Sequence, residues 1–169
     1  MSDTADTREL RNAFGCFATG ITVVTALGGQ GKAVGVTANS FTSLSLDPPL
    51  VLWSIGRQSA TFDVFSVTPA FVISVLGANA LPVSMRFAMK GAHYVDEIDT
   101  VPTELGPPTF EGALAIFECE TYARYEGGDH VIVVGRVKRF AYVPDPDRNG
   151  EKPLLYYRGR YGTLADFTG

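Results

Sequence analysis

The sequence predicts a mainly β (α+β) protein, a barrel or sandwich of antiparallel strands with short helices at its periphery. Six short runs rich in β-branched and aromatic residues follow one another, without the long helical segments that alternate with strands in a parallel sheet. Hydrophobic residues make up 46% of the chain and charged residues 19%, which suffices for a packed core and suggests surface hidden against a partner. The 169 residues are expected to form one domain, with its core over about residues 8–164.

The first expected element is a short amphipathic helix. Apolar residues recur at spacings of three and four between Thr7 and Ala18, at Leu10, Ala13, Phe14 and Phe17. Gly20 is expected to end the helix.

The first two strands are expected in "ITVVTAL" and "KAVGVTA", joined by the turn "GGQGK", whose glycines readily adopt positive φ angles. A phosphate-binding P-loop is rejected, because Ala26 and Ala33 stand where that pattern requires Gly and Ser or Thr. The other four strands are expected in "PLVLWSI", "AFVISVL", "ALAIFECETYARY" and "HVIVVGRVKRFAYV".

Two further short helices are predicted after strands. In "SATFDVF", Ser59 is expected to cap the helix with Asp63 in the following turn, and in "LPVSMRFA" Pro82 suits a first helical turn. The segment from Lys90 to Gly112 is rich in proline and glycine and is expected to be an irregular surface excursion.

Composition argues against several classes of function. A net charge of -4 without a dense basic run argues against nucleic acid binding. The polar N-terminus does not resemble a signal peptide and no apolar run reaches the length of a membrane span, so we expect a cytoplasmic protein that does not cross a membrane. Cys16 and Cys119 are expected to be buried thiols, and His93 and His130 have no metal-site spacing, so no metal is expected.

Three stretches could carry chemistry. Between Gly35 and Trp53, "GVTANSFTSLSLDPPLVLW" holds six small, uncharged hydrogen-bonding side chains before the first charge at Asp47. It could form a solvated strand edge, a structural ladder of hydroxyls, or the lining of a site for an uncharged ligand with polar edges.

The other two stretches are also open to more than one interpretation. In "YEGGDHVIVVGRV", His130 begins a strand and could be structural, with Asp129 capping the turn, or could contact a cofactor. In "YYRGRYGTL", Arg158 and Arg160 could belong to an exposed edge strand or could clamp a phosphate or stack on a ring. "G-x-S-x-G" and "G-x-G-x-x-G" are absent, which argues against a serine hydrolase and a Rossmann domain.

Taken in order, these stretches resemble the flavin reductase-like domain, the short-chain reductase components of two-component flavin-dependent monooxygenases. The resemblance runs through "LRNAFGCFATGITVVTA", "GVTANSFTSLSLDPPLVL", "QSATFDVF", "MRFA", "GGDHVIVVGRV" and "PLLYYRGRYGTL", and covers nearly the whole chain. It implies an FMN-binding split barrel with peripheral helices, acting as a homodimer with flavin near the subunit interface.

The resemblance also implies a set of site residues. The polar edge of the isoalloxazine ring would be bordered by Thr37, Ala38, Asn39 and Ser40. The ring or its ribityl chain would be flanked by Ser54 and Ile55, with Phe87 and Tyr161 nearby. The flavin phosphate would meet hydroxyls and helix N-terminal amides of Ser59, Ala60 and Thr61. His130 would be the catalytic residue, beside both nicotinamide and flavin.

The implied activity is an NAD(P)H:flavin oxidoreductase that passes a hydride from C4 of NADH or NADPH to N5 of FMN or FAD. Its reduced flavin would supply a separate oxygenase. The alternatives are a flavin-binding carrier or sensor without reductase turnover, and a split-barrel oxidase of the pyridoxamine phosphate type. The excursion after Lys90 matches the family only loosely, so no role is assigned to His93 or Tyr94.

Overall fold

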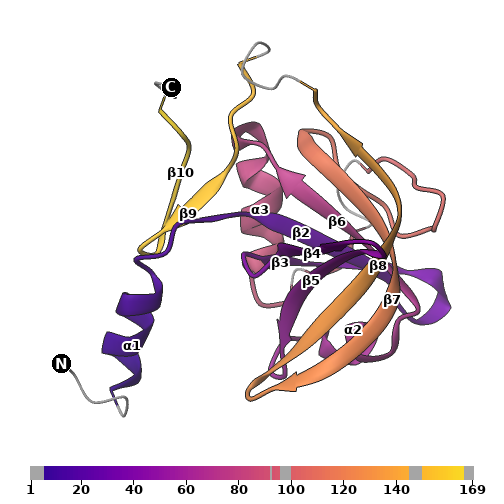
Figure 1. The fold of residues 1–169 in the computed structure, drawn as a ribbon, viewed down its shortest axis with the longest axis horizontal. Coiled ribbons are helices and arrows are strands. Elements are labelled where there is room, and N and C mark those ends of the chain that lie inside the picture. Colours follow the sequence, from indigo (N-terminus) through magenta and orange to yellow (C-terminus); the bar gives the residue numbers. More distant parts are fainter. Residues whose placement is uncertain (1–5, 92, 96–99, 145–149, 166–169) are drawn as a thin grey trace.

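The computed structural model describes residues 6–91, 93–95, 100–144 and 150–165, and within them the chain folds into two antiparallel sheets with short helices around them (Figure 1). The larger sheet has the strand order β3-β2-β6-β7-β8-β5-β4 and the smaller one the order β1-β9-β10. The larger sheet comprises β2 (Thr22–Leu27), β3 (Ala33–Ala38), β4 (Thr42–Leu46), β5 (Pro49–Gly56), β6 (Ala70–Leu76), β7 (Ala113–Gly127) and β8 (His130–Tyr142). The smaller sheet comprises β1 (Thr19–Gly20), β9 (Leu155–Tyr157) and β10 (Arg160–Gly162). The helices are α1 (Thr7–Phe14), α2 (Phe62–Val67) and α3 (Leu81–Ala88), with short 3-10 turns at Gly29–Gly31 and Ala78–Ala80.

The mainly β prediction is confirmed, and each of the six predicted runs is a strand of the larger sheet. The sheet curls into a barrel whose interior is filled from several strands and from α2. Trp53 of β5 is fully buried there, with its ring 4.9 Å from Phe65 of α2 and 6.0 Å from Phe71 of β6. These edge-on aromatic contacts hold α2 against the barrel through Phe65, the buried residue of this helix.

A second apolar cluster lies on the other face of β2. Val24 of β2 belongs to the barrel interior, whereas Val23 packs with Phe87 of α3 and Phe110. Because β2 is buried on both faces, its sequence is a nearly continuous apolar run. The cluster places α3 against β2 and β3, beside the site described below.

The glycine-rich turn joins β2 and β3 in the predicted antiparallel hairpin. Its positive φ angles lie at Gly31, as expected for a glycine, and at Gln30. The sequence analysis missed β4 because Thr42–Leu46 is polar and mostly exposed, and this strand pairs only with β5 at the sheet edge. The sequence analysis also did not predict the strands of the smaller sheet, which are only two or three residues long.

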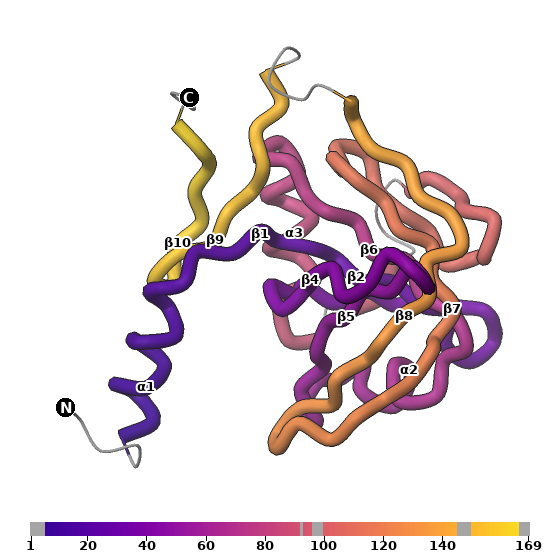
Figure 2. The backbone as a smooth tube through the Cα atoms, in the orientation of Figure 1, coloured from indigo at the N-terminus to yellow at the C-terminus, as the bar shows by residue number. Residues whose placement is uncertain are grey.

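The first helix differs from the prediction. It ends at Phe14, four residues before Ala18, and Asp6 caps it by accepting from the amides of Arg8 and Glu9. None of its residues is buried, and Phe14 is 69% exposed. Figures 1 and 2 show α1 standing clear of the barrel on one side, below the β9-β10 hairpin, so the predicted apolar face has no cover within the described chain.

Three other expectations need correction. Cys119 is a buried thiol of the barrel core, but Cys16 is exposed because it follows the uncovered helix. The second helix begins at Phe62, so Ser59 does not cap it, although Asp63 does lie in its first turn. By contrast, α3 matches "LPVSMRFA", with Pro82 in its first turn.

The Pro- and Gly-rich excursion is irregular as predicted but is not wholly on the surface. Val95, Thr109 and Phe110 are buried, and the hydroxyls of Thr109 and Ser74 lie 2.7 Å apart. Residues 92 and 96–99 of this segment lie outside the described part of the chain. Among the helices that the structure describes, none is long and apolar enough to cross a membrane.

Candidate functional site

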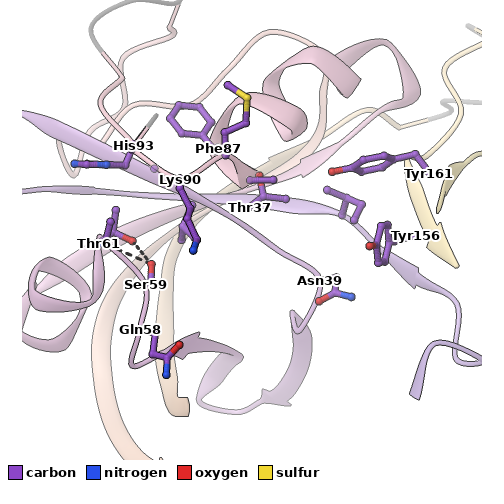
Figure 3. A pocket seen from close by; sticks show the side chains of 17 residues that line it. Thr37, Asn39, Gln58, Ser59, Thr61, Phe87, Lys90, His93, Tyr156 and Tyr161 are labelled. Atoms are coloured by element: carbon purple, nitrogen blue, oxygen red, sulfur yellow. Dashed lines mark hydrogen bonds between the residues drawn. The ribbon is translucent and has the colours of Figure 1, made fainter. Parts of the chain in front are cut away.

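Two cavities meet where β3 ends. The larger, of about 660 Å³, lies between β3, the loop after β5, the end of α3 and the tyrosines of the small sheet (Figure 3). The smaller, of about 200 Å³, lies where β3 faces the end of β5 across the open side of the barrel. The two share four lining residues, Val36, Thr37, Asn39 and Ser59, so they form one continuous site.

Every residue that the sequence analysis assigned to the site lines one of these cavities. The larger cavity is lined by Thr37, Asn39, Ser59, Ala60, Thr61, Phe87 and Tyr161. The smaller one is lined by Thr37, Ala38, Asn39, Ser40, Ser54, Ile55, Ser59 and His130. Residues more than 120 positions apart in the sequence therefore come together at one place.

A chain of hydrogen bonds fixes one wall of the larger cavity. The Thr37 hydroxyl donates to the carbonyl oxygen of Ser84 at 2.7 Å, and the fully buried Ser84 hydroxyl donates to the Tyr161 hydroxyl at 3.0 Å. The chain joins β3, α3 and β10. Since Thr37 has used its hydrogen, its hydroxyl offers the cavity only acceptor capacity, whereas Tyr161 keeps a hydrogen to donate.

The turn after β3 is pinned to β5 by a reciprocal pair of hydrogen bonds. The Ser54 amide donates to the Ser40 hydroxyl at 2.9 Å, and that hydroxyl donates to the Ser54 carbonyl at 3.3 Å. Ser40 is thus a structural link. Asn39 beside it makes no hydrogen bond through its carboxamide within the described chain, and both its donor and its acceptor remain available.

The loop after β5 offers hydroxyl groups to the larger cavity. The hydroxyl oxygens of Ser59 and Thr61 lie 3.0 Å apart, and the Thr61 amide donates to the Ser59 hydroxyl at 3.3 Å. The amides of Ser59 and Phe62 also bind carbonyl oxygens of this loop. Of the three amides expected to face the flavin phosphate, those of Ser59 and Thr61 are therefore already engaged within the loop.

His130 begins β8 directly opposite Gly56 of β5. Its Nδ1 lies 2.7 Å from Oδ1 of Asp129, while Nε2 is 3.4 Å from the position that a Cβ atom on Gly56 would take. The hydrogen bond and the charge of His130 lower the pKa of the exposed Asp129 carboxyl. A glycine at position 56 leaves room for the imidazole, whose side chain is about half exposed to the smaller cavity and solvent.

Arg57 ties the His130 turn to the loop after β5. Its amide donates to the Asp129 carbonyl at 2.9 Å, and its guanidinium forms an ion pair with Glu126 of β7. Ser59 is two residues after Arg57 in the chain. The contacts of Arg57 therefore fix the position of the Ser59 loop relative to the turn before His130.

Phe87 belongs as much to the core as to the site. Its ring lies against Gly35 of β3, where a Cβ atom would come within 2.9 Å, and 5.4 Å from the ring of Phe110. The residue is 4% exposed and lines the larger cavity. The absence of a side chain at Gly35 leaves room for the ring against β3.

Several lining residues were not assigned by the sequence analysis. The larger cavity also contains Gln58, Lys90, His93 and Tyr156. Tyr156 belongs to "YYRGRYGTL", the stretch in which Arg158 and Arg160 were candidates for contacting a phosphate or a ring. Neither arginine lines these two cavities. Arg158 instead lines a third cavity of about 700 Å³, between α1 and the β9-β10 hairpin, which shares Asn39 and Tyr156 with the larger one.

The side chains of the site limit its chemistry. Among the described residues that line the two main cavities, none is Asp or Glu, and none forms a pair of nucleophile and base. Within the described chain, no group of three His, Cys, Asp or Glu side chains is arranged to hold a metal ion. Neutral hydrogen-bonding groups beside apolar walls suit a planar, uncharged heterocycle with polar edges.

Comparison with known proteins agrees with this geometry. The family model for the flavin reductase like domain matches residues 14–165. The FMN reductase (NADH) SmoA of Agrobacterium fabrum is 43% identical over 160 residues, 95% of this chain and 87% of that protein. The reductase component of the flavin-dependent trigonelline monooxygenase of Acinetobacter baylyi is 40% identical over 158 residues, 94% of this chain and 49% of that protein.

A solved structure is similar over nearly the full length. The Streptomyces globisporus NADH:FAD oxidoreductase SgcE6, in complex with NAD and FAD fragments, has a TM-score of 0.88 and 38% identity. The match covers 98% of this chain and 96% of that chain.

Proposed function

The chain belongs to the flavin reductase-like domain family, and we propose on that premise that it is an NADH:flavin oxidoreductase that supplies reduced FMN or FAD to a separate monooxygenase. The observation that carries the proposal is the continuous site of two cavities, lined by residues from β3, β5, the loop after β5, α3, β8 and β10.

The residues present fit a flavin. Cavities of about 660 and 200 Å³ that share four residues have the size of a cofactor site. The free carboxamide of Asn39 and the donor hydrogen of Tyr161 match a ring system with carbonyl and imide edges, and Phe87 supplies apolar contact. A flavin held there would supply, at its N5 atom, the acceptor for a hydride from C4 of a reduced nicotinamide.

The protein then has to bind the flavin and the nicotinamide and align their rings. The reaction requires no nucleophilic side chain. We assign Thr37, Ala38 and Asn39 to the polar edge of the ring, Ser54 and Ile55 to its flank, and Ser59 to Thr61 to its phosphorylated chain. His130, placed at the mouth of the smaller cavity, orients the nicotinamide beside the flavin. Holding two rings within about 3–3.5 Å supplies much of the rate enhancement by orientation alone, and this fits the lack of carboxylates in the site.

A homodimer is part of the proposal. Helix α1 has no buried residue although Phe14 and Phe17 lie on it or just after it. The cavity under this helix opens onto Asn39 and Tyr156 of the larger cavity, so a second copy seated against α1 would close the flavin site from outside. We place the protein in the cytoplasm, where reduced nicotinamide is available to it and where its two free cysteines remain thiols.

The experiment that tests the proposal follows the loss of nicotinamide absorbance for NADH and NADPH while FMN and FAD are titrated. Saturable oxidation of NADH that depends on added flavin is expected, together with anaerobic accumulation of reduced flavin. His130→Ala is expected to raise the KM for NADH more than the Kd for flavin. Tight flavin binding without turnover would overturn the reductase assignment in favour of a carrier or sensor.

A further inference from the structure

The third cavity, of about 700 Å³ between α1 and the β9-β10 hairpin, lies outside the site assigned to the flavin. Its volume is in the range of about 300–1,000 Å³ that is common for small-molecule sites. Asn39 lines this cavity and both main cavities, and Tyr156 lines this one and the larger. A ligand bound beside Asn39 can therefore extend from the flavin site into the third cavity.

Two arginines and one carboxylate give the third cavity a net positive charge. Its charged lining residues are Glu9, Arg11 and Arg158, whereas the chain as a whole carries a net charge of -4. Neither arginine forms an ion pair within the described chain, and the Arg158 guanidinium lies 5.9 Å from the ring centroid of Tyr157. A guanidinium binds phosphate oxygens through two parallel hydrogen bonds, so the cavity favours a phosphorylated ligand over a neutral one.

The backbone conformation at Arg158 is unusual for an arginine. Arg158 and Gly159 form the two-residue turn between β9 and β10, with φ angles of 49° and 77°. Positive φ at both positions is typical of a type I′ turn, in which Asn, Asp or Gly is favoured at the first position. The Arg158 amide also donates to the Gly15 carbonyl at 3.0 Å, which ties the turn to the end of α1. An arginine in this strained conformation beside a cavity indicates a use for its side chain.

Neutral groups of the third cavity suit the rest of a nucleotide. The Thr19 hydroxyl oxygen is buried and has no hydrogen-bond partner within the described chain, and Thr19 lines the cavity. A ligand hydroxyl would satisfy this oxygen. The cavity is also lined by Phe14, Phe17 and Tyr156, which offer aromatic surface to a base.

We propose that the third cavity binds the adenosine diphosphate part of NADH, with Arg11 and Arg158 at its phosphates, while the nicotinamide lies beside His130. The inference rests on the proposed function, because it takes NADH as the co-substrate. Asn39, which lines all three cavities, marks the passage between the two halves of the dinucleotide. FAD also contains adenosine diphosphate, but its adenosine is joined through the flavin phosphate. That phosphate is assigned to Ser59–Thr61, outside the lining of the third cavity, so NADH is the better occupant.

The test measures binding of ADP-ribose, which corresponds to NADH without its nicotinamide, to the full chain by isothermal titration calorimetry. Arg158→Asn is expected to raise the Kd for ADP-ribose by about tenfold, because the phosphates lose a charge-assisted partner. Asn suits the first position of the turn, so this variant should fold as the wild type does. Arg158→Lys should keep part of the affinity, since it keeps the charge but not the planar fork of donors. In steady-state assays of Arg158→Asn, the KM for NADH should rise by a similar factor with little change in kcat or in the Kd for FMN.

Arg160→Gln is the matched control, since it removes the same charge from the same hairpin outside the lining of the three cavities. It should leave the Kd for ADP-ribose unchanged. Equal Kd values for Arg158→Asn and the wild type would overturn the proposal. A rise confined to the Kd for FAD, with the values for FMN and ADP-ribose intact, would overturn it too and assign the cavity to the adenosine of FAD. Because ADP-ribose binding is measured without turnover, a wild type that binds it through Arg158 but does not oxidise NADH would refute the reductase function and support the site.

Discussion

The imidazole of His130 is held by its own neighbour: Nδ1 lies 2.7 Å from Oδ1 of Asp129, and the opposite edge of the ring lies over Gly56. With Nδ1 engaged by the carboxylate, the hydrogen sits on that nitrogen in the neutral ring and Nε2 is the nitrogen left for a ligand. Asp129 is itself fixed, because its carbonyl accepts from the Arg57 amide at 2.9 Å. The hydrogen-bonded support of His130 thus comes from Asp129 and Arg57, which do not line the two cavities.

Asp129→Ala is expected to raise the KM for NADH by about fivefold, with little change in flavin affinity, because the imidazole loses its orienting acceptor. Asp129→Asn keeps an acceptor oxygen and should retain most of the affinity. Glu111→Ala removes an exposed carboxylate elsewhere and serves as the control. Equal KM values for Asp129→Ala and the wild type would show that the carboxylate does not orient the ring.

The pH dependence of this contact follows from the lowered pKa of Asp129. A carboxyl group whose pKa is lower in the folded protein stabilises it above the unfolded pKa, and this contribution disappears as the pH falls through the folded pKa. Asp129 therefore stays ionised to a lower pH than an ordinary Asp carboxyl group. In the wild type, the KM for NADH measured as a function of pH should show no inflection assignable to Asp129 between neutral pH and the ordinary titration range of such a group.

Gly135 of β8 is required by packing in the barrel core. A Cβ atom there would lie 2.5 Å from Cζ of Phe71 and 2.9 Å from Cβ of Cys119, both fully buried. Gly135→Ala is expected to lower the free energy of unfolding by about 2 kcal/mol, measured by chemical denaturation. Gly20→Ala is the control, because a Cβ atom at Gly20 would meet no atom within 4 Å. Equal stability of the two variants would contradict this account of the core.

The sequence predicted best those elements whose burial is reflected in local composition. The bounds of β6 and α3 match the predicted runs residue for residue, because the first is mostly apolar with Val and Ile at its centre and the second has a proline in its first turn. The roles of the site residues were harder to predict from composition. Hydroxyl-rich composition left the stretch from Gly35 to Trp53 open between a structural and a binding role, and the structure supports a structural role for the hydroxyls of Ser40 and Thr37.

The elements that the sequence analysis missed or misplaced depend on tertiary context. β4 is an exposed edge strand whose polar residues carry no buried face to reveal it. The burial of Phe110 in a proline-rich segment follows from its packing against α3, which no local pattern contains. Lys90 is a single lysine after a helix, and only the fold shows that it stands in a cavity without carboxylates.

The thiol of Cys119 should be inert in the folded protein. Burial, with the nearby Glu118 carboxylate, raises its pKa to about 12, so almost no thiolate forms at neutral or mildly alkaline pH. Alkylation followed by mass spectrometry should modify Cys16 and not Cys119 under native conditions, and both after denaturation. Native modification of Cys119 at the rate of Cys16 would show that the barrel core opens far more readily than its packing indicates.

The uncovered face of α1 makes the homodimer directly testable. Phe14 and Phe17 are 69% and 78% exposed, so replacing both by Glu removes no contact from the barrel core and should leave the fold of the monomer intact. If a second copy covers this face, two buried carboxylates there would cost far more than the lost apolar contact, and the mass measured by light scattering should fall to that of one chain. Flavin affinity should fall as well, since the cavity under α1 opens onto Asn39 and Tyr156. Val67→Glu, on α2 and 76% exposed, adds charge at an apolar position away from this arm and should leave the mass unchanged. A double variant that remains a dimer with wild-type flavin affinity would place the subunit interface on another face of the barrel.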